Sequence, residues 1–139
     1  MGLIMNDCLF CKIINGEIPS IKVYENHGSI AFMDIKPVNP GHVLIVSKKH
    51  FENMLEADDE TLADVAVAAK KVALAVKNAL KADGINLAAN NGRVAGQVIF
   101  HLHWHIIPRF ENDGLRLWPG KEISTEELKE IAKKIEKEL

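Results

Sequence analysis

The chain has 139 residues, of which 47% are hydrophobic and 26% charged, so it can form one globular domain with its own core and is too apolar for a disordered chain. Its formal net charge of −2 provides no broad basic face, so we expect no binding to duplex DNA or RNA. No apolar run has the length of a membrane span, and the apolar start, residues 1–5, lacks the basic residues and the length of a signal peptide. We therefore expect one cytoplasmic domain over residues 1–139, without membrane attachment.

Hydrophobic periodicity predicts the first elements in chain order. Residues 22–26, 29–34 and 42–47 are short, apolar and partly β-branched, which predicts three strands. A long helix is predicted over residues 59–82, with Asp58 or Asp59 as its N-cap and Gly84 at its end. The apolar face of this helix consists of Leu62, Val65, Ala66, Ala69, Val72, Ala73, Val76 and Leu80.

Two further strands, 85–90 and 97–108, and a helix over 125–139 complete the chain. Ser124 and Glu127 have the spacing of a capping box at the start of this last helix. Its apolar face consists of Leu128, Ile131, Ala132 and Ile135. The order of strands, long helix, strands and helix predicts an α+β fold, in which the long helix packs on an antiparallel sheet.

Three histidines alternate with apolar residues in the strand predicted over 97–108. Successive side chains of a strand point to opposite faces. The face expected in the core carries Phe100, Leu102, Trp104 and Ile106, and the other face carries His101, His103 and His105. Neighbours on one face lie roughly 6.6–7 Å apart at Cα, whereas zinc binds nitrogen at about 2.0–2.1 Å. A straight strand therefore cannot direct all three to one metal, and at least one imidazole is available for nucleophilic or acid–base chemistry.

The segment Asn90-Asn91-Gly92-Arg93-Val94-Ala95-Gly96-Gln97 precedes the histidines. Its small residues let backbone N–H groups approach an anion, and Gln97 adds an amide donor. A tight connection between strands would have a similar composition, so the loop by itself leaves both interpretations open. Beside three aligned histidines we interpret it as a phosphate-binding loop.

Cys8 and Cys11 form a C-x-x-C pair near the start of the chain. A disulfide is disfavoured in the cytoplasm, and a thioredoxin-like redox pair would follow a strand, which is not predicted here. The pair can also supply half of a zinc site. The remaining ligands could come from His27, His42, His50 or the row of three, and the spacing does not choose among them.

Together these segments resemble the histidine triad (HIT) superfamily. His101-Leu102-His103-Trp104-His105-Ile106-Ile107 fits its His-φ-His-φ-His-φ-φ motif. Further similar segments are Phe32-Met33-Asp34-Ile35, Pro40-Gly41-His42, Ser47-Lys48-Lys49-His50, and Asn90 followed by Gly96-Gln97. The resemblance spans residues 8–110, and the cysteine pair and the length are closer to the Hint branch than to the Fhit branch. It implies a HIT-like fold and a homodimer.

The resemblance also implies roles for individual residues, because family members bind nucleotides and cleave them at the α-phosphate. His103 matches the nucleophile, and His105 matches the residue that hydrogen-bonds the phosphate or the leaving group. The implied substrate-binding residues are Phe32 and Ile35 for the base, Asp34 for the ribose, and Asn90, Gly96, Gln97 and Val98 for the phosphate. Val98 stands where the Hint branch often has Ser, so only its backbone N–H remains for this contact. The implied ligands of a structural zinc are Cys8, Cys11, His50 and His101.

We therefore expect a hydrolase or transferase that acts on purine nucleoside phosphoramidates or related conjugates through a nucleotidyl-His103 intermediate. The alternatives are a dinucleoside polyphosphate hydrolase, a nucleotide-binding regulatory or scaffold protein with little turnover, and a metallohydrolase whose catalytic metal is held by His101 and His103. His42 is interpreted either as a structural residue or as one that supports the site residues through a contact, since it lies near the expected site.

Overall fold

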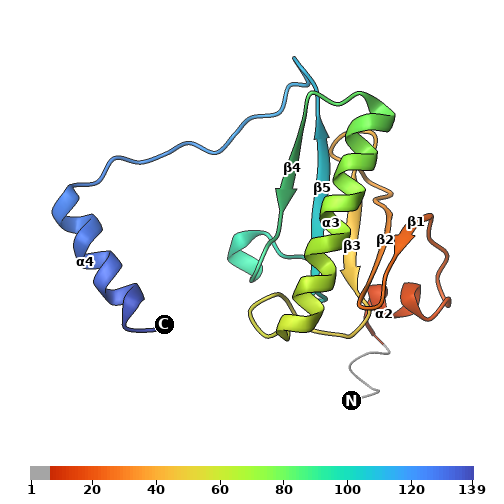
Figure 1. Ribbon diagram of the computed structural model, residues 1–139, viewed down its shortest axis with the longest axis horizontal. Helices are drawn as coiled ribbons and strands as arrows, with labels where there is room; N and C mark the ends of the chain where they lie inside the picture. Colours follow the sequence, from red (N-terminus) through yellow and green to blue (C-terminus); the bar gives the residue numbers. More distant parts are fainter. Residues whose placement is uncertain (1–6) are drawn as a thin grey trace.

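The computed structural model describes residues 7–139, so the apolar start at residues 1–5 lies outside the described residues. Five strands form one antiparallel sheet in the order β1-β2-β3-β5-β4 (Figure 1). The strands are β1 (Lys22–Glu25), β2 (Ser29–Met33), β3 (Val43–Ser47), β4 (Gly84–Ala88) and β5 (His103–Arg109). The helices are α2 (Leu9–Ile14), α3 (Asp59–Leu80), α4 (Thr125–Glu136) and the one-turn 3₁₀ helix η1 (Arg93–Ala95). The predicted α+β fold with an antiparallel sheet is confirmed.

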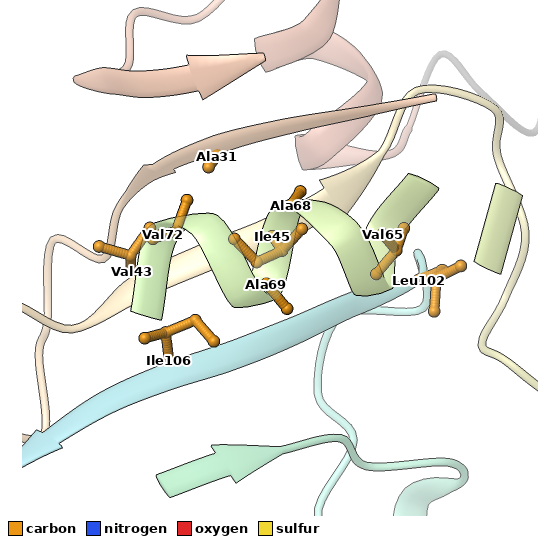
Figure 2. Close-up of a cluster of buried hydrophobic side chains, with 9 residues drawn as sticks. All are labelled: Ala31, Val43, Ile45, Val65, Ala68, Ala69, Val72, Leu102 and Ile106. Atoms are coloured by element: carbon orange, nitrogen blue, oxygen red, sulfur yellow. The ribbon is translucent and has the colours of Figure 1, made fainter. Parts of the chain in front are cut away.

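The main core lies between α3 and one face of the sheet (Figure 2). Its buried members are Ala31, Val43, Ile45, Val65, Ala68, Ala69, Val72, Leu102 and Ile106. Ala68 and Ala69 have no side chain beyond Cβ, so the helix can approach the strands closely. Burial of each larger aliphatic side chain contributes about 1.5–3 kcal/mol to folding.

The long helix starts as predicted but ends earlier. The Asp58 side chain accepts a hydrogen bond from the Thr61 N–H at 2.8 Å, which confirms it as the N-cap. The helix ends at Leu80, because Lys81 adopts the left-handed conformation (φ 54°) that closes many helices. The expectation that Gly84 ends the helix is wrong, since Gly84 is the first residue of β4.

The face of α3 that meets the sheet also differs from the predicted one. Ala66 is exposed and Ala68 is buried, because the buried stripe runs through Thr61, Val65, Ala68, Ala69 and Val72. Leu80 is 44% exposed and extends over Gly41, where a Cβ would require the Leu80 side chain to move.

The strand predicted over residues 97–108 is shorter than expected, because ladder pairing with β3 begins only at His103. Residues 97–102 form an irregular approach to β5. Leu102 is buried as predicted, whereas Phe100 is 41% exposed, so its assignment to the core face is wrong. The side-chain amide of Gln97 donates to the carbonyl oxygens of Glu52 and Ile99, which holds this approach in a loop.

Helix α2 covers part of the opposite face of the sheet and was not predicted. Phe10 packs there against Ile30, Phe32, Leu44 and Val46 in a second core cluster. Cys8 is the N-cap of α2, and its Sγ accepts a hydrogen bond from the Cys11 N–H at 3.4 Å. Six residues are too few for helical periodicity to be recognised in a sequence.

Helix α4 stands apart from the rest of the chain. Ser124 caps it by accepting a hydrogen bond from the Glu127 N–H at 3.2 Å, as predicted. Residues 111–124 form an extended segment that carries α4 away from the sheet (Figure 1). No helix in the described part of the chain is long and apolar enough to cross a membrane.

Truncation of Ile45 tests the assignment of the main core. Ile45 is completely buried in β3, so Ile45→Ala is expected to lower the free energy of unfolding by about 2–5 kcal/mol. Ile21 is 68% exposed, and Ile21→Ala is expected to change this free energy by at most about 0.5 kcal/mol. Denaturant titration of both variants measures the difference, and equal losses would contradict the proposed core.

Candidate functional site

Two clusters of side chains lie side by side on the face of the sheet that α2 partly covers. The first consists of Cys8, Cys11, His50 and His101, and the second of Asp34, His42 and His105. His103, at the start of β5, lies between His101 and His105 in the chain. The structure therefore brings all three histidines of the row into one region and divides their partners into two groups.

The first cluster has the donor set of a structural zinc site. Its donor atoms all lie within 4.8 Å of one another. The His101 Nδ1 is 3.2 Å from the Cys8 Sγ and 3.1 Å from the His50 Nδ1, and the Cys11 Sγ is 3.3 Å from the His50 Nδ1. A tetrahedral zinc with two sulfur and two nitrogen ligands sets such separations at roughly 3.3–3.8 Å. The residues therefore fit this metal.

Several elements bring these four ligands together. Cys8 and Cys11 lie on the first turn of α2, where residues three apart share a face, and both are free thiols. The His101 Nε2 donates to the carbonyl oxygen of Ser47 at 2.7 Å, which turns Nδ1 toward the thiols. Burial lowers the pKa of His101 to about 4, so the imidazole is neutral, as a metal ligand must be. Burial also raises the pKa of the Cys11 thiol to about 11, which favours the protonated form. A bound cation would favour the thiolate instead.

A cavity of about 300 Å³ opens beside the second cluster, at the low end of the range for ligand pockets. Helix α2 and strand β2 supply apolar walls, and the histidines of β5 face the interior. Among the residues that line it are Phe10, Phe32, Asp34, Ile35, Asn90, Gly96, Val98, His103 and His105. All predicted substrate-binding residues except Gln97 therefore border one cavity.

The hydrogen bond of His103 fixes the tautomer of its ring. Its Nδ1 lies 2.6 Å from the carbonyl oxygen of His101. A carbonyl oxygen can only accept, so Nδ1 carries the proton and the lone pair of Nε2 is unused. Burial lowers the pKa of His103 below its ordinary value, while the hydrogen bond to the His101 carbonyl opposes this shift. His103 therefore presents a neutral nitrogen with a free lone pair near pH 7, as a nucleophile would require.

A hydrogen bond from His42 fixes the His105 ring in the tautomer opposite to that of His103. The Val38 N–H donates to the His42 Nδ1 at 3.1 Å, so the neutral His42 ring carries its proton on Nε2. This Nε2 lies 2.9 Å from the His105 Nδ1 and donates to it. Neutral His105 consequently carries its own proton on Nε2. Burial is the main cause that lowers the pKa of His42, and it lowers the pKa of His105 to about 4, so this arrangement persists at neutral pH.

Asp34 and the base-side residues lie at the end of β2. The Asp34 Oδ2 is 3.6 Å from the His42 Nε2, and its Oδ1 accepts from the Lys36 N–H at 2.8 Å. Phe32 is buried edge-to-face against Phe10, with ring centroids 5.6 Å apart, whereas Ile35 is exposed at the cavity. The apolar wall is therefore fixed on one side and open on the other.

Gln97 is buried and does not line the cavity. Its amide donates to two backbone carbonyls, as described above, and its Oε1 accepts from the Gly92 N–H at 2.8 Å. Its backbone N–H donates to the Gly92 carbonyl. The residue holds the shape of the loop and has no N–H left for an anion.

Gly96 and Val98 form the part of the loop that borders the cavity. Gly96 has φ +99°, and a Cβ there would lie 3.3 Å from the Asn90 amide nitrogen, so glycine is required. The Val98 N–H has no hydrogen-bond partner within residues 7–139. This N–H is therefore free to bind an anion in the cavity, the contact that the family resemblance implies.

Two contributors to the site were not assigned from the sequence. His42, interpreted from the sequence as either structural or supporting the site residues but without a named partner, fixes the tautomer of His105, and Phe10 packs against the His103 ring at a centroid distance of 5.0 Å. The signal for His42 was its position one residue before β3. It lies two residues before Leu44, which pairs with His105, so period-2 alternation places both histidines on one face.

The fold and the two histidine clusters define a class of protein in which a row of histidines on an antiparallel sheet borders a small ligand cavity. The HIT domain family matches residues 15–112, and the chain belongs to this family. The relatives are consistent with the Hint-like branch.

The chain is 48% identical to an uncharacterized HIT-like protein of Methanocaldococcus jannaschii, with 92% of this chain and 98% of the relative covered. It is 42% identical to the adenosine 5'-monophosphoramidase of Schizosaccharomyces pombe, with 92% and 95% covered. A crystal structure of a HIT family member from Bacillus subtilis matches with a TM-score of 0.90 and 42% identity, over 96% of this chain and 97% of that chain. A Zn-bound histidine triad family protein from Mycobacterium smegmatis matches with a TM-score of 0.76 and 34% identity, over 85% and 86%.

The tautomers of the two catalytic candidates can be measured directly. We expect long-range ¹⁵N–¹H NMR spectra to show the proton on Nδ1 of His103 and on Nε2 of His105. At pH 6 the His105 ring should remain neutral, because its pKa is lowered to about 4. His42→Ala should leave the His103 tautomer unchanged, whereas His105 should then populate both tautomers. The same tautomer on both rings would contradict the assignment.

Proposed function

We propose that the protein cleaves purine nucleoside phosphoramidates or related nucleotide conjugates at the α-phosphate, as a homodimer in the cytoplasm. The observation that carries this proposal is the pair of neighbouring rings with opposite tautomers. One presents a lone pair to the cavity and the other an N–H group. The relative named as an adenosine 5'-monophosphoramidase supports a nucleotide-cleaving function.

In the first step, the His103 Nε2 attacks the α-phosphorus and forms a P–N bond. The bond to the leaving group breaks as the leaving atom takes up a proton from solvent, and the His105 Nε2–H hydrogen-bonds the leaving atom or a phosphate oxygen. The His103 ring becomes cationic in the intermediate. The carbonyl oxygen of His101, 2.6 Å from the protonated Nδ1, stabilises this charge.

In the second step, water attacks phosphorus and releases one proton to solvent, the bond to the His103 Nε2 breaks, and the nucleoside monophosphate is released. His103 returns to its neutral form. Two displacements through a covalent intermediate replace one more difficult displacement. Donors fixed in advance, such as the Val98 N–H and the His105 N–H, can stabilise the charge on the phosphate oxygens without reorganisation.

The remaining substrate contacts follow from the cavity. The Asp34 carboxylate lies beside the histidines and can accept hydrogen bonds from ribose hydroxyls. Phe32 and Ile35 provide an apolar surface for the base. Asn90 and Gly96 border the phosphate region, and Gln97 acts by holding the loop.

We propose a structural zinc held by Cys8, Cys11, His50 and His101. A zinc with four protein ligands fixes its ligands in place and leaves no open position for substrate. The His101 Nδ1 faces the thiols, and the His103 Nδ1 faces a backbone carbonyl. These directions disfavour a catalytic metal shared by His101 and His103.

Turnover of adenosine 5'-phosphoramidate to AMP tests the proposed reaction. The wild-type protein should release AMP and give an adenylylated His103 when quenched in denaturant at alkaline pH, where the P–N bond survives, and mass spectrometry detects this adduct. His103→Ala removes the nucleophile and should lower kcat on the order of 10³-fold or more. His27→Ala, an exposed substitution outside the cavity, serves as the matched control. Binding of AMP without turnover or adenylylation would favour a regulatory or scaffold protein, and turnover of a dinucleoside polyphosphate alone would favour the other hydrolase.

Metal analysis tests the zinc site independently of the reaction. Purified protein should contain one zinc per chain, and Cys11→Ala should lose it, whereas His27→Ala should retain it. At free zinc of about 1,000 times Kd, zinc should add about 4 kcal/mol to the free energy of unfolding. Chelation should remove this increment in wild type and have no effect in Cys11→Ala. Metal-free protein with both thiols freely reactive would refute the site.

A further inference from the structure

Helix α4 is amphipathic, but no residue in the described part of the chain, residues 7–139, covers its apolar face. Leu128, Ile131 and Ile135 lie on this face and are 53%, 41% and 56% exposed, and no residue of the helix is buried. A helix of twelve residues is only marginally stable alone in water and usually owes its stability to packing of its apolar face. Within residues 7–139 this face has no packing partner, so a surface of another molecule can cover it.

The C-terminal arm, residues 111–139, extends away from the sheet and does not fold back on it (Figure 1). It makes up about a fifth of the chain. A superposition that misplaced it could not reach the TM-score of 0.90 found with the Bacillus subtilis crystal structure over 96% of this chain. The extended placement thus also occurs in an experimentally solved chain.

An open apolar groove lies between the C-terminal half of α3 and strands β1 and β2, with a volume of about 680 Å³. Its walls include Ala75, Val76 and Ala79 of α3 and Val23, Met33 and Phe110 from the sheet side. Val23 is 50% exposed, so the groove is not closed by its own chain. It is separate from the nucleotide cavity, which lies on the face of the sheet that α2 covers.

Two features of the groove suit α4: small side chains that let a helix approach, and a lysine at the edge that a glutamate of α4 can reach. Ala75 and Ala79 are one helical turn apart and exposed, so a second helix can approach α3 closely there. Lys71 lies at the edge of the groove, and its ammonium forms no ion pair within residues 7–139. Glu127 and Glu136 flank the apolar stripe of α4 on its two sides, so one of them can pair with Lys71.

We propose that α4 of each chain docks in the groove between α3 and β1–β2 of a second copy of this chain. The direction of the arm favours the second copy over the chain's own groove. Exchange of two identical arms forms a closed, two-fold symmetric dimer. The inference rests on the proposed homodimer and is independent of the proposed nucleotide chemistry.

Disulfide trapping between two different chains tests this docking. A full-length Ala75→Cys chain with a mass tag is refolded together with an untagged Ile131→Cys chain and oxidised. We expect a mixed disulfide between tagged and untagged chains on a non-reducing denaturing gel. Lys133→Cys, on the opposite face of α4, should give at least 10-fold less, and wild-type protein sets the background from Cys8 and Cys11. Absence of the mixed disulfide overturns the proposal.

A double variant, Ala75→Cys with Ile131→Cys, separates the two possible grooves. Docking in the second copy gives disulfide-linked dimers, whereas docking in its own groove gives mainly a disulfide within one chain and overturns the proposal. Sedimentation equilibrium provides a second measurement. Ile131→Asp should raise the dimer dissociation constant at least 10-fold and Lys133→Asp should not. An unchanged constant in Ile131→Asp overturns the docking, even if the protein remains dimeric and active.

Discussion

The hydrogen bond from the His101 Nε2 to the carbonyl oxygen of Ser47 determines the arrangement of the whole site. It turns the other ring nitrogen toward Cys8 and Cys11, so the imidazole can serve as a metal ligand. The backbone carbonyl of the same residue accepts the proton of the His103 Nδ1. One buried residue therefore connects the cluster that fits zinc to the proposed nucleophile. A metal bound there would fix the position of His101, and therefore of the carbonyl oxygen that orients the His103 ring.

Alternation along β5 places His103 and His105 on one face, but it does not make them chemically different. Their partners do so, because a carbonyl oxygen can only accept a hydrogen bond, whereas His42 is oriented by the Val38 N–H to donate one. One ring therefore presents a free lone pair and the other an N–H donor, and both rings are neutral. Burial lowers the pKa of both, which keeps these roles distinct at neutral pH.

The sequence predicted those features that depend on residues only a few positions apart in the chain. The α+β order, the Asp58 cap and the Ser124 cap are of this kind, and the structure confirms all three. The row of histidines and its resemblance to the HIT superfamily also located the cavity residues. The contribution of Gln97 was less predictable, because its amide bonds to carbonyls of Glu52 and Ile99 and becomes a support of the loop. A side chain of this kind can bind a ligand or its own backbone, and composition does not distinguish the two.

Local pattern by itself determined which residues form strands and helices and which face of β5 carries histidines, since side-chain direction repeats with the period of each element. Only the tertiary structure decided where β5 begins, that Cys8 to Ile14 form a capped helix, and that His42 contacts His105. These features depend on contacts between residues 39 to 93 positions apart, such as those of Cys11 with His50 and Cys8 with His101. Likewise, the periodicity of α4 revealed an apolar face but not its partner, because a sequence pattern records that a surface must be covered and contains no information about which surface covers it.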